Sequence, residues 1–321
     1  MRKARSIRPP RFESDIEFDA RRSDTEFWRP YVEAVLERIG RGGDERYLTI
    51  GTSASWPVFL HGDIAVKLFG QREDWRAAFR SERAAHVVLA ADPGIAAPGL
   101  VAEGRLFLGN ETSWPYLVTT RLPGVDWREA EPDPDQRTVL ARELGRQIRR
   151  LHAIRAWGEV ATSADRPVRN VREAALRSSL PLHLAEQAAD FVARMGIHNR
   201  PEDRVFRHGG LSPRHILVEN GHLSGLLDWG GAMVDDRHSE LPRLLLDTFL
   251  GDKILLRLFL EAARWPVGRD FPRRALAHTL ARQADARSRH GFSDLFLVPA
   301  RRYPLEDMQT LDELAVAVFG I

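Results

Sequence analysis

The spacing of hydrophobic residues over the first part of the chain predicts a small antiparallel sheet with a packed helix. Residues 24–40 repeat large apolar side chains at helical spacing, after a capping Asp24 and before Gly40. Strands are expected at 46–51, 56–61, 63–69, 100–108 and 115–121, with a helix at 74–91. Strands interrupted by one helix are typical of a small α+β unit, which we assign to residues 21–121.

The second part of the chain has mainly helical periodicity. Leu122, Pro123 and Gly124 break the pattern after the last of these strands, so residues 119–125 are interpreted as a hinge. Helices are expected at 136–154, 171–178, 183–195, 239–263, 270–287 and 308–318. The sequence thus predicts an α+β fold of two lobes, in which residues 122–321 form the larger, mainly helical lobe.

A hairpin is the one pair of strands expected in the helical part, and polar side chains lie at its ends. Residues 216–218 and 223–227 read as strands, and Asn220-Gly221 between them is a two-residue turn signal. Such a hairpin places Asp228, after the second strand, against the loop 208–215 before the first. A carboxylate in that position suits a magnesium ligand, because hard cations prefer oxygen.

Composition narrows the class of protein. The 321 residues are 43% hydrophobic and 29% charged, include no cysteine and have a net charge of +2. Disulfides, a zinc ribbon and thiol catalysis are therefore excluded, and no apolar run is long enough for a membrane span. Basic and acidic residues are interleaved, so we expect no nucleic-acid partner. Residues 1–20 begin with several basic residues, and no apolar segment of the kind found in a secretory signal follows them. We therefore expect a disordered basic tail and a cytoplasmic protein.

The stretch from His208 to Gly230 resembles the catalytic and metal loops of the aminoglycoside phosphotransferase and choline kinase family. That family reads HGDxxxxN, then a hairpin, then I-D-[FW]-G; here the segments are HGGLSPRH and LLDWG. The resemblance implies a protein-kinase-like fold, a nucleotide-binding small lobe, ATP (or GTP) and Mg²⁺ as cofactors, and a small-molecule hydroxyl as acceptor. Two positions depart from the family: Gly210 replaces the catalytic Asp, and His215 replaces a metal-binding Asn.

A lysine in an apolar strand needs a partner. Lys67 lies in the strand IAVKLF, where an unpaired ammonium would be costly. Glu82, fifteen residues later on the helix at 74–91, is the expected partner, and Glu73 is a weaker one. The resemblance implies that Lys67 binds the nucleotide phosphates. The alternative is a lysine at a strand edge and a solvated glutamate.

Two further segments are expected to contact the nucleotide. Small residues between two of the strands, among them Ser53 and Ser55, allow backbone amides to approach phosphates, although a plain turn explains them as well. In the family that this chain resembles, the hinge backbone binds the adenine edge, which here implies Thr119, Thr120 and Leu122.

The catalytic residues implied by the resemblance are His208, which would hold the loop, with Gly210, Ser212 and His215. Asp228 and His215 would bind the metal ion, although imidazole is a poorer magnesium ligand than an amide oxygen. His215 could equally anchor the loop. Glycine supplies no base at position 210, a contribution of about 10²–10⁴-fold in rate.

Three interpretations of Gly210 stay open: a weak or inactive relative, replacement of the base by another group such as Asp235, Asp236, Ser212 or His215, or a substitution in this sequence. Two functions are accordingly expected: phosphoryl transfer to a small molecule such as an antibiotic, which would give antibiotic resistance, or nucleotide binding by a scaffold without activity. Residues 240–321 contain 12 Lys and Arg against 11 Asp and Glu, which favours a neutral or anionic acceptor over a polycationic aminoglycoside. The sequence leaves the oligomeric state open.

Overall fold

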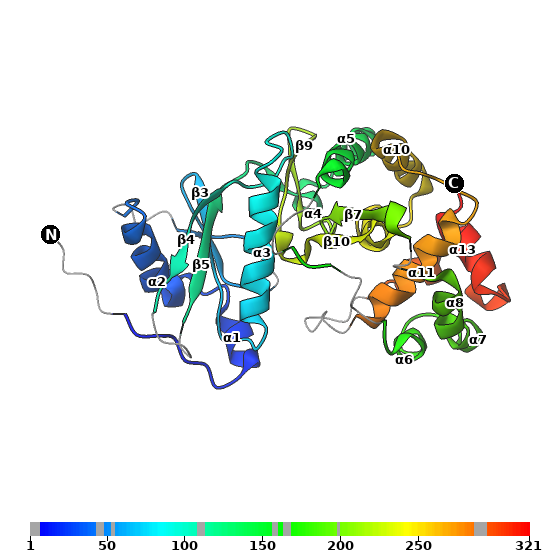
Figure 1. Ribbon diagram of the computed structural model, residues 1–321, viewed down its shortest axis with the longest axis horizontal. Helices are drawn as coiled ribbons and strands as arrows, with labels where there is room; N and C mark the ends of the chain where they lie inside the picture. Colours follow the sequence, from blue (N-terminus) through cyan, green and yellow to red (C-terminus); the bar gives the residue numbers. More distant parts are fainter. Residues whose placement is uncertain are drawn as a thin grey trace.

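The computed structural model describes residues 7–42, 48–52, 55–107, 113–155, 160–162, 168–197, 200–285 and 294–321. These residues form two lobes that lie side by side along the long axis of the molecule (Figure 1). Each lobe has its own hydrophobic core, the first between Phe18 and Val118 and the second mainly after Trp127. The architecture is the two-lobed α+β arrangement that the sequence predicts.

The small lobe is built on a five-stranded antiparallel sheet. Its strands are β1 (Thr49–Ile50), β2 (Val58–His61), β3 (Ile64–Leu68), β4 (Leu100–Arg105) and β5 (Pro115–Thr120), in the order β1-β2-β3-β5-β4. In β3, the residues at 64, 66 and 68 are buried and those between them are half-buried. Because side chains alternate across a strand, Lys67 projects from the face opposite to its two buried neighbours.

Two helices flank this sheet (Figure 1). α2 (Thr25–Arg38) lies on the side away from the large lobe, and Asp24 caps it by accepting a hydrogen bond from the Phe27 amide. α3 (Trp75–Leu89) lies between the sheet and the large lobe. Its last turns bury residues in the core of the large lobe, so the middle of α3 stands at the junction of the two lobes.

The N-terminal segment differs from the disordered tail expected over residues 1–20. Residues 15–21 form a helix, α1 (Asp15–Arg21), which Ser14 caps. Phe18 is fully buried, and the Phe12 ring meets it edge-on with 5.3 Å between centroids. Aromatic burial on the small lobe outweighs the basic character that suggested a tail. Residues 1–6 lie outside the described residues.

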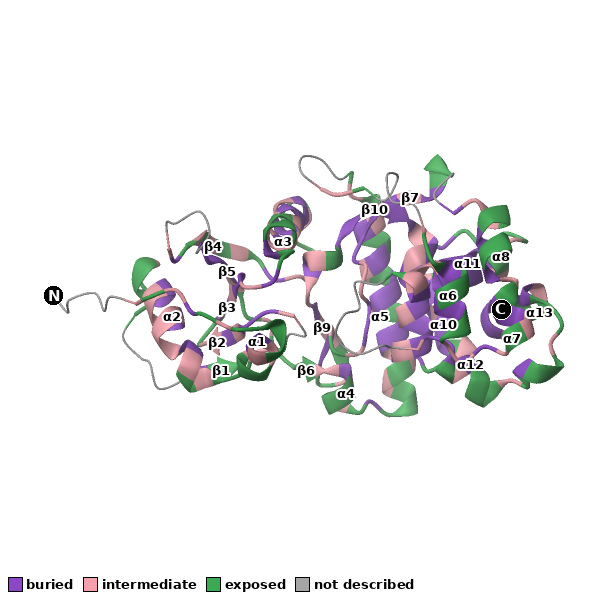
Figure 2. Ribbon diagram, turned by 90° about the horizontal axis from the view of Figure 1, so that it is seen from below, coloured by how far each residue is buried: buried purple, intermediate pink, exposed green. Residues whose placement is uncertain are grey.

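The large lobe is mainly helical. Its helices are α4 (Trp127–Ala130), α5 (Pro134–Ala153), α6 (Val171–Leu176), α7 (Leu182–Glu186), α8 (Ala188–Met195), α9 (Leu241–Arg243), α10 (Lys253–Ala263), α11 (Phe271–Ala284), α12 (Leu297–Arg302) and α13 (Leu311–Phe319). α5 and α10 run through the most buried part of the lobe (Figure 2). They pack closely at Gly145, where a Cβ atom would overlap the Phe259 carbonyl oxygen. Among the described residues, no helix is long and apolar enough to cross a membrane.

Two short sheets complete the large lobe. β6 (Val125–Asp126), β8 (Ile216–Glu219) and β9 (His222–Leu226) form one, and β7 (Arg204–Arg207) pairs with β10 (Met233–Asp236) in the other. The β7–β10 ladder and α12 are absent from the sequence prediction. The helix expected at 239–263 is divided, because residues 244–248 form a π-helical turn and Leu250 and Gly251 have positive φ. The helix expected at 183–195 is likewise two helices, α7 and α8.

Candidate active site

The hairpin β8–β9 brings two polar loops together where the two lobes meet. Asn220 and Gly221 have φ values of 52° and 79°, as a two-residue hairpin turn of this kind requires. At the open end of the hairpin, opposite this turn, the Leu227 amide donates a hydrogen bond to the His215 carbonyl, 2.8 Å away. Asp228 therefore stands beside the loop 208–215, where the hairpin pattern places it.

Lys67, Glu82 and Asp228 meet where the two lobes join. The Lys67 Nζ atom lies 2.9 and 2.6 Å from the two Glu82 carboxylate oxygens, and 3.1 Å from Asp228 Oδ1. The Ser81 hydroxyl on α3 also donates to the Gly230 carbonyl at 3.0 Å. The small lobe thus supplies an ammonium and a glutamate, and the large lobe supplies a second carboxylate.

Lys67 and Asp228 each favour the charged form of the other. Burial alone would lower the pKa of Lys67, but the Glu82 and Asp228 carboxylates raise it above its ordinary value. Burial would raise the pKa of Asp228, but Lys67 and His215 hold it well below the usual range. The Asp228 side chain is 33% exposed, against 11% for Lys67, so the carboxylate keeps an open face that a cation can approach.

His208 holds the loop and does not face the cleft. Its side chain is fully buried, and burial lowers its pKa to about 3. Nε2–H donates to the Leu227 carbonyl at 2.9 Å, and Nδ1 accepts from the Gly210 amide at 3.2 Å. One ring therefore ties the loop 208–215 to the end of the hairpin.

His215 is oriented like a metal ligand. A carbonyl oxygen only accepts, so the 2.7 Å contact between Nδ1 and the Gly210 carbonyl places the ring proton on Nδ1. The other ring nitrogen, Nε2, lies 3.3 Å from Asp228 Oδ2. An imidazole nitrogen and a carboxylate oxygen at this spacing are suited to bind one divalent cation, so the residues fit a metal ion.

The two glycines of the loop differ in what they tolerate. Gly209 has a φ of 85°, and a Cβ there would overlap the Gly231 carbonyl, so no other residue fits without strain. A Cβ at Gly210 would lie 3.5 Å from His215 Nδ1 and 3.9 Å from His208 Nδ1, which are ordinary contacts. The backbone therefore has room for a side chain at position 210, the position of the family's catalytic Asp.

Residues 35–277, about three quarters of the chain, match the model of the phosphotransferase enzyme family, APH. The chain belongs to this phosphotransferase family. The sequence resemblance to aminoglycoside phosphotransferases is confirmed by this match.

Solved structures of similar fold include two antibiotic phosphotransferases. The GDP and kanamycin complex of APH(2")-IIia has 17% identity and a TM-score of 0.63, over 85% of this chain and 99% of that one. Macrolide 2'-phosphotransferase MphH from Brachybacterium faecium has 21% identity and a TM-score of 0.57, over 88% of this chain and 100% of that one. At these identities the likeness establishes the fold.

A buried glutamate that the sequence motif did not reveal supports the loop 208–215. Glu240 is 1% exposed, and its two carboxylate oxygens accept from the His208 amide at 2.5 Å and the Gly209 amide at 3.1 Å. Burial raises its pKa. Ser212 lies buried in the same loop, whose turn is closed by a 3.0 Å bond from the His215 amide to the Ser212 carbonyl.

Asp235 and Asp236 are placed away from catalysis. Asp235 accepts from Arg207 Nε at 2.8 Å, and both side chains are buried. Asp236 binds Arg274 and His238, and its side chain is 1% exposed. The interpretation that either aspartate replaces the missing base at position 210 is wrong, because both are held in buried ion pairs.

The residues expected to contact the nucleotide differ in the partners that they have within the protein. Ser55 is half-buried three residues before β2, and Ser53 lies outside the described residues. The Thr120 hydroxyl accepts from the Gly99 amide at 2.9 Å, and its own amide donates to the Gly99 carbonyl, so Thr120 serves the sheet. Thr119 pairs with Ala65 in the ladder. The amide of the half-buried Leu122 makes no hydrogen bond with a described residue.

Proposed function

We propose that this chain transfers the γ-phosphate of ATP or GTP to a hydroxyl group of a small molecule. The observation that carries the proposal is the meeting of Lys67 and Asp228, 161 residues apart in sequence, with 3.1 Å between Nζ and Oδ1. Phosphoryl transfer needs a cation on the phosphates, a held metal ion and a positioned acceptor. At the junction of the lobes, the Lys67 ammonium is suited to bind the phosphates and the Asp228 carboxylate is suited to hold the metal ion.

Each residue has a distinct task in this proposal. Lys67 binds the α- and β-phosphates, and Glu82 holds it in position through the two hydrogen bonds. Asp228 Oδ2 and His215 Nε2 bind a divalent metal ion, which supplies positive charge to the phosphate oxygens when bound. His208 and Glu240 position the loop, and the Leu122 amide faces the base of the nucleotide.

Catalysis then depends on position and charge, since Gly210 offers no base. The loose transition state of phosphoryl transfer draws most of its stabilisation from positioning and charge neutralisation. The acceptor proton therefore leaves to water or to a phosphate oxygen in this proposal, and turnover is slow. The near balance of 12 basic and 11 acidic residues over 240–321 supports a neutral or anionic acceptor, and the names of the similar structures support an antibiotic.

Calorimetry with nucleotides tests the nucleotide site directly. We expect ATP or GTP to bind only with a divalent ion, and Lys67→Met and Asp228→Asn each to abolish that binding. Lys253→Met is a matched control, because Lys253 at the start of α10 donates to the Ala317 carbonyl of α13, away from Lys67 and Asp228. Wild-type protein that binds no nucleotide, or binding that survives both changes in the cleft, contradicts the proposal.

A nucleotide-binding scaffold without transfer is the second candidate, and Gly210 is the observation that favours it. Both functions predict the same binding data. An assay for the transfer of labelled γ-phosphate to a panel of hydroxyl-bearing antibiotics separates the two functions. Phosphorylated product from the wild-type chain supports the enzyme, and its absence with intact nucleotide binding supports the scaffold.

A further inference from the structure

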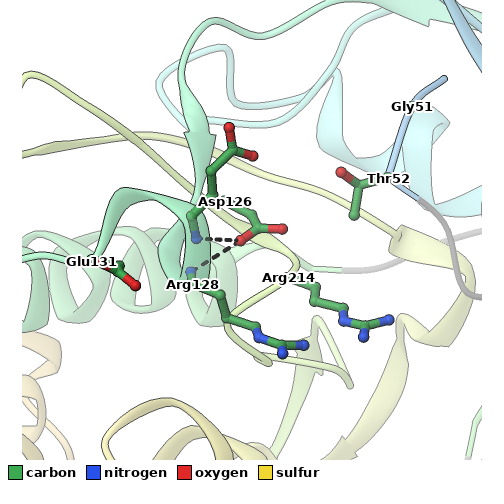
Figure 3. Close-up of a pocket in the computed structure, with 7 residues that line it drawn as sticks. Gly51, Thr52, Asp126, Arg128, Glu131 and Arg214 are labelled. Carbon is green, nitrogen blue, oxygen red and sulfur yellow. Dashed lines mark hydrogen bonds between the residues drawn. The ribbon is translucent and has the colours of Figure 1, made fainter. Parts of the chain in front are cut away.

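The loop 208–215 has an open side and a buried side. On the open side it borders a pocket of about 630 Å³ lined by residues of both lobes, among them Arg214 of the loop and Thr52 of the small lobe (Figure 3). On the buried side, the Glu240 carboxylate accepts hydrogen bonds from the first two amides of the loop. A ligand can therefore approach the loop from the pocket, while the large lobe holds the loop from behind.

Thr248 makes a second contact with the buried side of this loop. Its hydroxyl donates to the Leu211 carbonyl at 3.1 Å, and both side chains are buried. Glu240 binds amides before Gly210, and Thr248 binds a carbonyl after it. The position where the phosphotransferase family has its catalytic Asp is thus held from both directions.

The Thr248 hydroxyl bonds to a different segment of the chain, although a threonine in a helix often donates to a carbonyl of its own helix. Thr279 on α11 shows the usual arrangement: it is fully buried, and its hydroxyl donates to the Ala275 carbonyl at 2.8 Å. Thr248 instead donates to a carbonyl 37 residues away in the sequence. The two buried hydroxyls therefore differ in what they stabilise, a helix in one case and the loop in the other.

A π-helical turn places Thr248 on the same side as Glu240. Residues 237–248 are helical without a break, and Leu244–Thr248 form the π turn, closed by a 2.9 Å hydrogen bond between residues five apart. An α-helix turns about 100° per residue, so residues eight apart lie about 80° out of line. The extra residue of a π turn makes eight residues turn about as far as seven, which leaves about 20°. The turn therefore lets one helical segment reach the loop twice.

The Thr248 hydroxyl is connected to His215 through the backbone of the loop. The carbonyl that accepts from Thr248 belongs to the peptide unit between Leu211 and Ser212, and the Ser212 amide donates to the Gly210 carbonyl at 2.7 Å. The same Gly210 carbonyl accepts from His215 Nδ1, also at 2.7 Å. A rotation of that peptide unit would therefore disturb the hydrogen bond that orients the His215 ring.

We propose that Thr248 is a positioning residue, which acts through the loop 208–215 to keep the His215 ring in the orientation that binds the metal ion. Its hydroxyl stabilises one orientation of the peptide unit between Leu211 and Ser212. That peptide unit fixes the Gly210 carbonyl, and the carbonyl fixes the ring. This inference rests on the proposed function, because it presumes a metal ion between His215 and Asp228.

Hydrogen–deuterium exchange of the protein without ligands tests whether Thr248 holds the loop. Thr248→Val removes the hydroxyl and keeps the size of the side chain, so we expect amides of residues 208–216 to exchange about two- to tenfold faster, the range for one neutral hydrogen bond. Thr248→Ser keeps the hydroxyl and should match the wild type. Thr279→Val is the matched control, because it removes a buried hydroxyl that bonds only within α11. Unchanged exchange in Thr248→Val, or an equal increase in Thr279→Val, overturns the inference.

Calorimetric titration with ATP in the presence of Mn²⁺ tests whether the hold reaches the metal site. We expect Thr248→Val to weaken binding by the same two- to tenfold, and Thr248→Ser and Thr279→Val to bind like the wild type. In His215→Ala protein the ring is absent, so Thr248→Val should cause little further loss.

The outcomes separate the role of Thr248 from the proposed function. A full additional loss in the His215→Ala background, or equal affinities for the wild type and Thr248→Val, overturns the role of Thr248 while nucleotide binding stands. Wild-type protein that binds no nucleotide with Mn²⁺ overturns the proposed function, even where exchange shows that Thr248 holds the loop.

Discussion

Gly210→Asp is the substitution that most directly tests the chemistry of the cleft. The Cβ atom of the new side chain would sit 3.5 Å from His215 Nδ1 and 3.9 Å from His208 Nδ1, both ordinary contacts. Gly210 is not among the residues with positive φ, so the backbone accepts a side chain without strain. The carboxylate would extend from the catalytic loop at the position that the phosphotransferase family uses for its base.

The size of the effect follows from what the change adds. A positioned general base contributes about 10²–10⁴-fold in rate, equivalent to about 3–5 kcal/mol of barrier. The new carboxylate adds a second negative charge near Asp228, but His215 lies beside both residues. We therefore expect kcat to rise within that range, while the dissociation constant of the nucleotide stays close to that of the wild type.

The assay is the transfer of radioactive γ-phosphate to a panel of hydroxyl-bearing antibiotics. Gly210→Asn keeps the shape of the new side chain without its basicity and should stay at the wild-type rate. Gly209→Ala is a structural control and should lower the melting temperature, because a Cβ there overlaps the Gly231 carbonyl. Equal rates for Gly210→Asp and Gly210→Asn, in protein that binds nucleotide normally, would refute the reasoning.

Three further predictions concern the loop, the metal and pH. Glu240→Ala should cost about 1–3 kcal/mol of unfolding free energy in urea melts, because two buried amides lose their acceptor. His215→Asn should shift metal preference from Mn²⁺ towards Mg²⁺ in calorimetric titrations, since imidazole favours the softer ion. Burial, with Arg237 and Arg207 nearby, lowers the pKa of His152 to about 3. The unfolded chain therefore takes up a proton first, and unfolding free energy should fall as pH drops below about 6.5, by up to about 1.4 kcal/mol per unit. His152→Leu should flatten this fall; an unchanged slope contradicts the assignment.

Patterns of neighbouring residues predicted most of the fold and the cluster of Lys67, Glu82 and Asp228. The apolar run of β3 predicted the strand that carries Lys67, and the Asn220-Gly221 turn predicted the hairpin that places Asp228. Period and turn chemistry are properties of neighbouring residues, so a single sequence displays them. The spacing of Lys67 and Glu82 likewise anticipated a contact between adjacent elements.

Features that depend on distant partners were missed. Residues 204–207 form β7 only because residues 233–236 pair with them, and neither stretch has a strong strand pattern of its own. Glu240 belongs to no motif, and its role depends on two amides of the loop 208–215, which lies about 30 residues earlier in the chain. The basic residues of the N-terminal segment suggested disorder, and only the burial of Phe18 shows why the chain folds there.

The ion pair between Lys67 and Asp228 partly neutralises both charges where the two lobes meet. A metal ion on Asp228 Oδ2 competes with the ammonium on Oδ1 for the same carboxylate, and a nucleotide that arrives alone must draw Lys67 away from it. Arriving together, each ligand takes the partner that the other releases. Metal and nucleotide should therefore strengthen each other's binding by the same factor, as thermodynamic reciprocity requires.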